Sequence, residues 1–168
     1  HASSTRADAP FVVVNAPAIT PEGMEAELFG VEAGPDRPRR VGALEEAHGG
    51  TLYLDEIADM PAETQAKILR VLVDQSFRRV GGTNPVQVDV RIISSTSRDL
   101  AQAITDGHFR EDLFHRLSVV PIRSPSLAER REDIPALIEY FLERVSADMG
   151  APPRPIAPDA MAVLQSHD

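Results

Sequence analysis

The sequence predicts an α/β fold, in which helices flank a parallel β-sheet and a small helical region follows. Three observations predict it. Short apolar runs rich in β-branched residues occur at residues 11–14, 51–54 and 88–95, and such runs are typical of buried strands. Stretches with helical periodicity separate these runs, as in sheets built with crossover helices. After the Ser-Pro-Ser sequence at residues 124–126, only helical patterns remain.

Local sequence features place the first elements. Thr20, Pro21 and Glu22 supply a capping residue, a proline at the first helical position and an acid in the first turn, so we expect a helix that runs to about residue 29. Residues 30–40 are rich in glycine and proline and are expected to form a loop. A second helix is expected to open at residues 60–61. Its apolar positions, expected to pack on the core, are Ala66, Ile68, Leu69, Leu72 and Val73.

The rest of the chain divides into two parts. Residues 77–80 and 86–88 flank a Gly-Gly-Thr-Asn-Pro sequence, which predicts a hairpin. Further on we expect helices at 99–106 and 111–117, a last strand at 119–122, and helices at 134–149 and 159–165. We therefore predict an α/β subdomain at residues 1–125 and part of a small helical lid at residues 126–168.

The bulk composition excludes several classes of protein. The 168 residues suffice for one domain with a real core, and 26% charged with 42% hydrophobic residues is ordinary for a globular protein. The sequence shows no cysteine, no signal-peptide pattern and no apolar run of membrane-spanning length, so we expect a cytoplasmic protein with no membrane partner. A net charge of −9 argues against a nucleic-acid-binding face on this chain.

The sequence Gly-Gly-Thr-Leu-Tyr-Leu-Asp-Glu at residues 49–56 carries the clearest chemistry. An apolar strand that ends in Asp55 and Glu56 would deliver two carboxylates to the edge of the sheet. Phosphoryl-transfer ATPases use such a pair, one carboxylate for Mg²⁺ and one to orient the attacking water. Taken alone, the pattern fits equally well a strand that happens to end in acidic loop residues.

The flanking motifs decide between these alternatives. In their order and spacing they resemble the central AAA+ ATPase domain of the sigma-54-dependent activators, the NtrC-like response regulators, over nearly the whole chain. The motifs are Glu-Leu-Phe-Gly at 27–30, Gly-Ala-Leu-Glu-Glu-Ala at 42–47, Phe-Arg-Arg-Val-Gly-Gly at 77–82, Phe-Arg-Glu-Asp-Leu at 109–113 and Arg-Arg-Glu-Asp-Ile-Pro at 130–135. The resemblance implies a P-loop-type parallel sheet, incomplete at its N-terminus, and part of a helical lid.

The resemblance also implies roles at the nucleotide site. Asp55 would hold Mg²⁺ and Glu56 would activate water for the hydrolysis of ATP. Asn15 would act as a switch that hydrogen-bonds the catalytic glutamate; the alternative is a turn residue at a strand end, a frequent place for Asn. Thr96 would sense the terminal phosphate, whereas Ser97 stands where the family has Asn and has a different donor arrangement.

Two arginines and a lid residue complete the implied site. Arg110 and Arg116 match the pair that reaches the nucleotide of a neighbouring subunit, which implies a homo-oligomeric ring, hexameric or heptameric by analogy with the family. The alternative for each arginine is a surface ion pair, for Arg110 with Glu111 or Asp112. Ile134 is assigned to contact with the nucleotide.

Three family features are missing from the sequence. No Gly-x-x-x-x-Gly-Lys-[Ser/Thr] phosphate loop occurs, and the family's lid arginine would come after the last residue. We therefore expect an inactive fragment of a longer regulator, itself a weak ATPase. The Gly-Ala-Phe-Thr-Gly-Ala loop that grips sigma-54 is replaced by a shorter sequence without aromatic residues at 31–38, which resembles the NtrX-type subgroup.

The sequence therefore favours the ATP-binding and ATP-hydrolysing module of an NtrX-like two-component regulator of nitrogen metabolism. Such a regulator would contact DNA, and its sensor kinase, through domains outside this chain, with RNA polymerase as a further partner. Two alternatives stay open. One is an ordinary sigma-54 activator, which the missing grip loop opposes. The other is a nucleotide-independent assembly scaffold, which the presence of Asp55, Glu56, Arg110 and Arg116 opposes.

Overall fold

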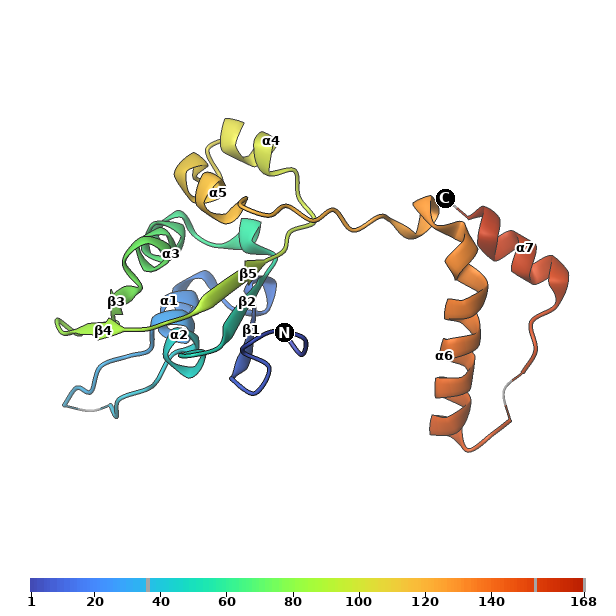
Figure 1. Cartoon of the computed structure of the whole chain (residues 1–168), viewed down its shortest axis with the longest axis horizontal. Coiled ribbons are helices and arrows are strands. Elements are labelled where there is room, and N and C mark those ends of the chain that lie inside the picture. The colour runs from blue at the N-terminus through green and yellow to red at the C-terminus, as the bar shows by residue number, and fades with distance from the viewer. Residues whose placement is uncertain (36, 153, 168) are drawn as a thin grey trace. The chain divides into compact units, whose positions relative to one another are not determined.

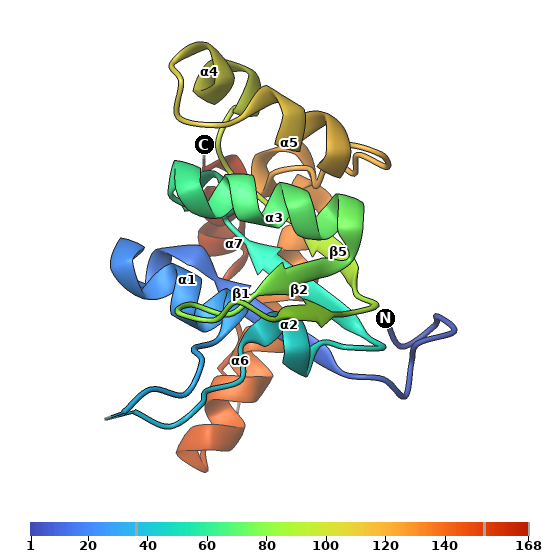
Figure 2. The same cartoon turned by 90° about the vertical axis from the view of Figure 1, so that its left-hand side faces the viewer.

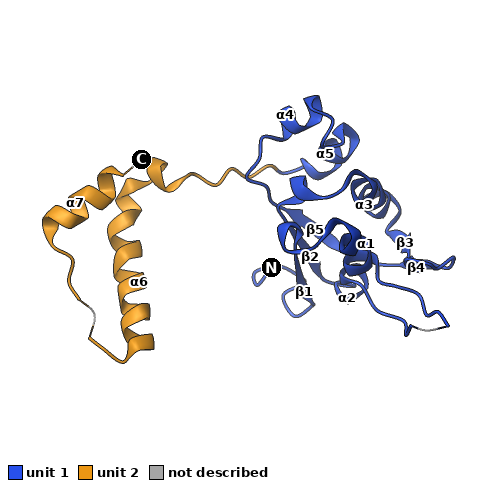
Figure 3. Cartoon of the chain, turned by 180° about the vertical axis from the view of Figure 1, so that it is seen from behind, with its two compact units in different colours: residues 1–120 blue, residues 121–168 orange. Residues whose placement is uncertain are grey.

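A computed structural model describes residues 1–35, 37–152 and 154–167. The chain divides into two compact units, residues 1–120 and residues 121–168, which Figure 3 distinguishes by colour.

A three-stranded parallel sheet forms the centre of the first unit (Figure 1). Its strands are β1 (Phe11–Asn15), β2 (Thr51–Asp55) and β5 (Arg91–Ser94), in the order β1-β2-β5. Both pairings are parallel, so the predicted parallel α/β sheet is confirmed. Because the strands share one direction, their carboxyl ends lie at the same edge of the sheet.

Five α-helices accompany this sheet among the described residues of the first unit. They are α1 (Pro21–Phe29), α2 (Ala43–Glu46), α3 (Ala62–Asp74), α4 (Leu100–Thr105) and α5 (Glu111–Leu117). The predicted start of α1 is confirmed, since the Thr20 hydroxyl accepts a hydrogen bond from the Gly23 N–H at 3.2 Å. Helix α3 packs against α5, as Figure 2 shows, and it also contacts the strand β3 (Ser76–Arg78).

The core lies under one face of the sheet. Along the strands the buried side chains alternate with exposed ones, as the pleat requires: Val14, Leu52 and Leu54 are buried, whereas Val13 and Ile93 are exposed. The largest fully buried apolar side chains are Phe29, Met24, Leu28, Leu44, Leu52, Leu54, Ile57, Ile68 and Leu113.

The prediction for the packed face of α3 is wrong at one position. Ile68 and Val71 are fully buried, but the side chain of Val73 is 58% exposed. At 3.6 residues per turn, Val73 is rotated by about 140° from Ile68, so it lies on the opposite side of the helix. The apolar character of Val73 alone did not place it in the core.

The loop at residues 30–40 and the predicted hairpin are joined to each other. Strands β3 and β4 (Pro85–Gln87) form the hairpin and pair antiparallel, which confirms the prediction. Val31 forms isolated bridges to Arg40 within the loop and to Val80 in the hairpin. The Arg79 side chain, only 9% exposed, donates hydrogen bonds to Glu32 in the loop and to Glu45 in α2. Loop, helix and hairpin are therefore held together by charged groups.

The strand predicted at residues 119–122 is wrong. These residues join no sheet within the described chain, and Val119, Val120 and Ile122 are 75%, 75% and 88% exposed. A β-branched run is stable as a strand only where a neighbour pairs with it, and Pro121 has no N–H to donate. The strand predicted at 88–95 begins only at Arg91, although Val88 and Val90 before it are buried.

The second unit is helical in its described residues. After two short 3₁₀ turns at Leu127–Glu129 and Arg131–Asp133 come α6 (Ile134–Met149) and α7 (Pro158–Ser166), which pack on each other. Gly150, with φ of 63°, ends α6 in a left-handed conformation. No helix in the described ranges of the chain is long and apolar enough to cross a membrane.

Candidate functional site

The polar residues predicted from the sequence meet at the carboxyl edge of the sheet. Asn15, the last residue of β1, lies opposite Asp55, the last residue of β2, in the strand register. Ser95 follows directly after β5. The parallel sheet thus places a carboxamide, a carboxylate and a hydroxyl on three adjacent strand ends.

Ser95 ties the end of β2 to the end of β5 through several hydrogen bonds. Its backbone N–H donates to the Leu54 carbonyl at 3.0 Å, and its own carbonyl accepts from the Ile57 N–H at 3.0 Å. Its hydroxyl donates to Asp55 Oδ1 at 2.6 Å and accepts from the Glu56 N–H at 3.4 Å. A single residue therefore contacts four consecutive positions, Leu54 to Ile57, at the end of β2 and in the turn that follows it.

Hydrogen bonds hold Asp55 through one carboxylate oxygen and leave the other oxygen available for a ligand. Oδ1 accepts from the Ser95 hydroxyl and, at 3.3 Å, from the hydroxyl of Tyr53. Oδ2 makes no hydrogen bond to any described residue, and the side chain is half-buried. Mg²⁺ takes oxygen ligands and needs only one or two protein carboxylates, with waters and phosphate oxygens as its other ligands. The chemistry at Asp55 fits that ion.

Glu56 has an unusual backbone conformation that aims its side chain. With φ of 54° and ψ of 55° it lies in the left-handed region, which is unfavourable for a residue with a Cβ atom. Its Oε2 accepts a hydrogen bond from the Ser97 N–H at 2.9 Å. That bond is the main reason why the pKa of Glu56 lies below its ordinary value. The carboxylate is therefore ionised at neutral pH and suited to orienting a water molecule.

Asn15 and Thr96 both lie at this edge of the sheet, and the Thr96 side chain contributes to the lowered pKa of Glu56. Asn15 is exposed, and its side chain makes no hydrogen bond to the described residues. The Thr96 hydroxyl accepts from the Arg98 N–H at 3.1 Å, and the side chain is half-buried. At Ser97 it is the backbone N–H that contacts Glu56.

Arg110 directly precedes helix α5, and Arg116 lies in its last turn. The Arg110 guanidinium forms a bidentate ion pair with Asp112, with Nε 3.0 Å from Oδ1 and Nη2 2.7 Å from Oδ2. This pair lowers the pKa of the Asp112 carboxyl. Arg116 is exposed, donates to the Leu72 carbonyl at 3.3 Å and pairs with no carboxylate among the described residues. Both guanidiniums are accessible from outside the molecule. Ile134, in the second unit, is 7% exposed and offers little free surface.

Sequence reasoning missed two contributors to the site, Ser95 and the backbone N–H of Ser97. The run Ser-Ser-Thr-Ser at residues 94–97, at the end of a strand, is the feature that could have pointed to them. A cluster of hydroxyls on a sheet edge beside two acids provides donors that carboxylates require. Backbone donors leave no trace in residue identity, so the role of Ser97 needed the structure.

The fold and the edge site define an AAA+ domain of the sigma-54 activator class. The model of a family described as the Sigma-54 interaction domain matches residues 1–123, and that of the AAA+ ATPase lid domain matches residues 128–168. The chain belongs to the Sigma-54 interaction domain family, which confirms the resemblance found in the sequence.

Individual relatives agree with this family. The chain is 66% identical to the nitrogen assimilation regulatory protein NtrX of Azorhizobium caulinodans, over all of this chain and 37% of that protein. It is 48% identical to the DNA-binding transcriptional regulator NtrC of Escherichia coli K12, over 98% of this chain and 36% of that protein. The crystal structure of Brucella abortus NtrX in complex with ATP has a TM-score of 0.93 and 66% identity, and the match covers 99% of this chain and 38% of that one. The chain thus spans little more than a third of each relative.

Proposed function

We propose that this chain is the part of an NtrX-like nitrogen regulator that carries the hydrolytic residues of an ATPase site. The observation that supports it is the arrangement at the sheet edge, where Ser95 orients Asp55 and the Ser97 N–H orients Glu56. Asp55 Oδ2 would hold Mg²⁺, which neutralises charge on the phosphate oxygens when bound. Glu56 would hold the attacking water in line with the terminal phosphate.

The same proposal assigns the remaining predicted residues. Arg110 and Arg116 would act in trans on the nucleotide of a neighbouring copy in a ring, since a guanidinium stabilises charge on the transferring phosphoryl group. Asn15 and Thr96 would report the state of the nucleotide, and Ile134 would contact it. No phosphate loop of the Gly-x-x-x-x-Gly-Lys-[Ser/Thr] type occurs in the 168 residues, so the phosphate cradle is not among the parts assigned.

The wider role follows from the relatives and is proposed for the protein that contains this chain. That protein would be a cytoplasmic response regulator that assembles through the AAA+ domain, receives a signal from a sensor kinase and binds DNA through other domains. The names of the relatives, a nitrogen assimilation regulator and a DNA-binding transcriptional regulator, support this proposal.

The test is ATP turnover and nucleotide binding by the protein that contains this chain. Glu56→Gln should keep binding of a fluorescent ATP analogue while kcat falls by about 100-fold or more, because the water is no longer oriented. Asp55→Ala should also weaken Mg²⁺-dependent binding. Glu46→Gln, which removes an exposed carboxylate of α2, is the matched control. Normal turnover by Glu56→Gln would exclude the assignment.

A second candidate is an ordinary sigma-54 activator, which the family description favours. The loop at residues 30–40 opposes it, because its sequence offers charges, glycines and prolines but no aromatic side chain to bury against a partner. Co-elution with sigma-54 in the presence of an ATP transition-state analogue decides between the two. We expect no stable complex; a complex that depends on the analogue would favour the second candidate.

A further inference from the structure

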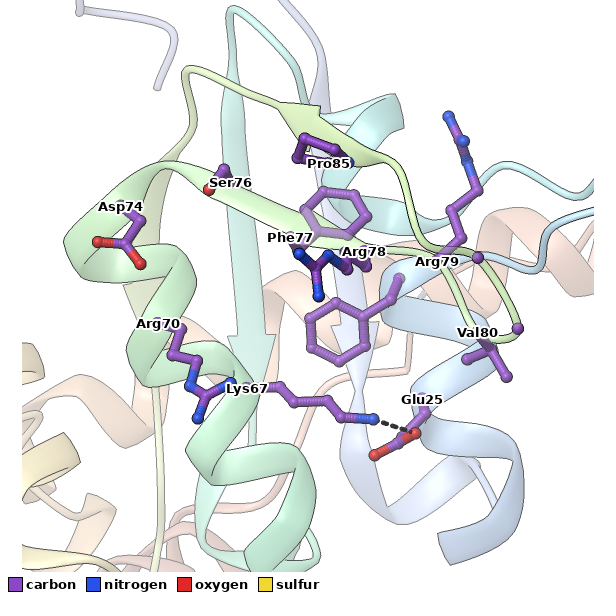
Figure 4. Close-up of a pocket in the computed structure, with 13 residues that line it drawn as sticks. Glu25, Lys67, Arg70, Asp74, Ser76, Phe77, Arg78, Arg79, Val80 and Pro85 are labelled. Atoms are coloured by element: carbon purple, nitrogen blue, oxygen red, sulfur yellow. Dashed lines mark hydrogen bonds and ion pairs between the residues drawn. The ribbon is translucent and has the colours of Figure 1, made fainter.

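A groove lies on the first unit, between α1, α3 and the hairpin of β3 and β4 (Figure 4). It has a volume of about 540 Å³. Its base includes two aromatic rings, Phe29 and Phe77, whose centroids are 5.6 Å apart and which are themselves almost fully buried. None of the residues that line it belongs to the site at the sheet edge. The groove is therefore separate from the proposed nucleotide site.

The walls of the groove carry more positive than negative charge. Lys67, Arg70, Arg78 and Arg79 line it, against two carboxylates, Glu25 and Asp74. This excess is local, because the whole chain has a net charge of −9.

Two of these four cations are already committed. Lys67 pairs with Glu25 at 2.5 Å, and its Nζ lies 5.9 Å from the centre of the Phe29 ring. The other oxygen of Glu25 is buried without a hydrogen-bond partner among the described residues. If Lys67 moved away to bind a ligand, both oxygens of this carboxylate would lack a partner, and the desolvation cost would rise. Arg79 is bound to Glu32 and Glu45.

Arg70 and Arg78 remain available. Both are exposed, and neither makes a hydrogen bond or an ion pair with any described residue. Figure 4 shows that they come from different walls, Arg70 from α3 and Arg78 from β3. Asp74 lies four residues after Arg70 on the same helix, but the two do not pair. A ligand with two separated negative charges can engage both arginines at once.

We propose that this groove binds an extended acidic segment of a protein partner, whose carboxylates pair with Arg70 and Arg78. Carboxylates match the planar donor fork of arginine. The committed pairs at Lys67 and Arg79 hold the walls in place before binding, which lowers the ordering cost. Nucleic acid fits less well, because its regular phosphate backbone needs a continuous basic stripe and the net charge of the chain would repel it.

The test measures binding of a fluorescein-labelled peptide, Asp-Ser repeated five times, by anisotropy at low ionic strength. Its control peptide repeats Asn-Ser. Arg70→Gln and Arg78→Gln should each weaken binding about fivefold, and the double variant about 25-fold. Asp74→Asn should strengthen it about twofold, because it removes a like charge from the groove. Arg91→Gln is the matched control, because it removes an exposed arginine of β5 that lies outside the groove and pairs with none of the described residues.

Several outcomes would overturn the proposal. The first is that the acidic peptide shows no saturable binding. The second is that the Asn-Ser peptide binds as tightly as the acidic peptide. The third is that Arg91→Gln weakens peptide binding as much as Arg70→Gln or Arg78→Gln does. Binding of inorganic phosphate or of a single-stranded oligonucleotide through the same arginines, without the peptide, would assign the groove to a different ligand. Should a variant fail to fold, amide shifts of the unaltered chain decide: shifts at Arg70, Arg78 and Gly81 on peptide addition support the proposal, and their absence refutes it.

Discussion

The hydroxyl of Ser95 donates a hydrogen bond of 2.6 Å to Oδ1 of Asp55. Asp55 ends β2 and Ser95 directly follows the neighbouring strand β5, so this bond couples the end of β5 to the carboxylate at the end of β2. Because a bound oxygen cannot rotate freely, the bond also fixes the direction of the second oxygen, Oδ2. Ser95 is thus a positioning residue for whatever Asp55 binds.

Ser95→Ala should therefore weaken Mg²⁺ affinity more than it weakens the fold. Partners that orient a metal ligand are worth about tenfold or more in metal affinity. In the protein that contains this chain, the Mg²⁺ concentration for half-maximal ATPase activity should rise about tenfold, and excess Mg²⁺ should restore turnover. Ser95→Thr should keep most of the affinity, since it retains the hydroxyl. An unchanged Mg²⁺ dependence would show that the bond is only structural.

Arg110→Ala and Arg116→Ala should each abolish turnover and be rescued in mixed assemblies. If each arginine serves the site of a neighbour, mixing either variant with Glu56→Gln places an intact arginine beside an intact glutamate in some sites. The ATPase rate of the mixture should exceed the sum of the separate rates. Asp112→Asn is the control, because it removes the ion-pair partner of Arg110 but leaves the guanidinium in place. Rings that assemble but show no rescue would indicate a structural role.

Arg79→Met should destabilise the first unit in a pH-dependent way. The guanidinium and its partner Glu45 have side chains only 9% and 15% exposed, so losing charge-assisted hydrogen bonds there should cost about 2 kcal/mol near neutral pH. Arg79 holds the pKa values of Glu45 and Glu32 below their ordinary 4.5. A carboxyl pKa that is lower in the folded state than in the unfolded state stabilises the fold at every pH above the unfolded value. This stabilisation is lost as the pH falls through the folded pKa and the carboxylates become protonated.

The difference in free energy of unfolding between the parent chain and Arg79→Met should accordingly be constant near neutral pH and shrink in acid. Urea denaturation at a series of pH values measures it. Arg78→Met is the matched control, since Arg78 is exposed and makes no ion pair with the described residues. A difference that grows in acid would contradict the assignment.

Gly50→Ala should destabilise the chain through a backbone clash. A Cβ atom at Gly50 would lie 2.0 Å from the carbonyl oxygen of Pro10, which also accepts the Thr51 N–H. Neither backbone can yield without moving β1 or β2, so we expect a cost of about 2 kcal/mol and a melting temperature lower by about 6 °C. Gly34→Ala is the control, because its Cβ would make an ordinary contact with the flexible Arg37 side chain. Equal melting temperatures would refute the clash.

Much of the fold could be predicted because its determinants are local. The cap at Thr20, the turn residues of the hairpin and the β-branched runs act within a few residues of themselves. Residues 119–122 have the same composition as a strand, but pairing is a property of the neighbour and not of the run. For the same reason, the exposure of Val73 depends on where α3 sits against the sheet.

The site was predictable in its residue types and less so in its contacts. The acids Asp55 and Glu56 stand out because they end an apolar strand. The bonds to Ser95 and to the Ser97 N–H join positions about 40 residues apart, and no local pattern encodes them. The left-handed backbone at Glu56 is also hidden, since neither glycine nor asparagine marks the turn.

At Glu56, the left-handed residue, the side chain that activity requires is not the one that stability favours. Glycine, which has no Cβ atom, would relieve the backbone strain at position 56, and asparagine would relieve part of it. Neither could hold the carboxylate where Glu56 holds it. A library of variants selected only for heat resistance should therefore drift toward glycine or asparagine here and discard the glutamate. Laboratory evolution of this chain needs a functional selection running beside the thermal one.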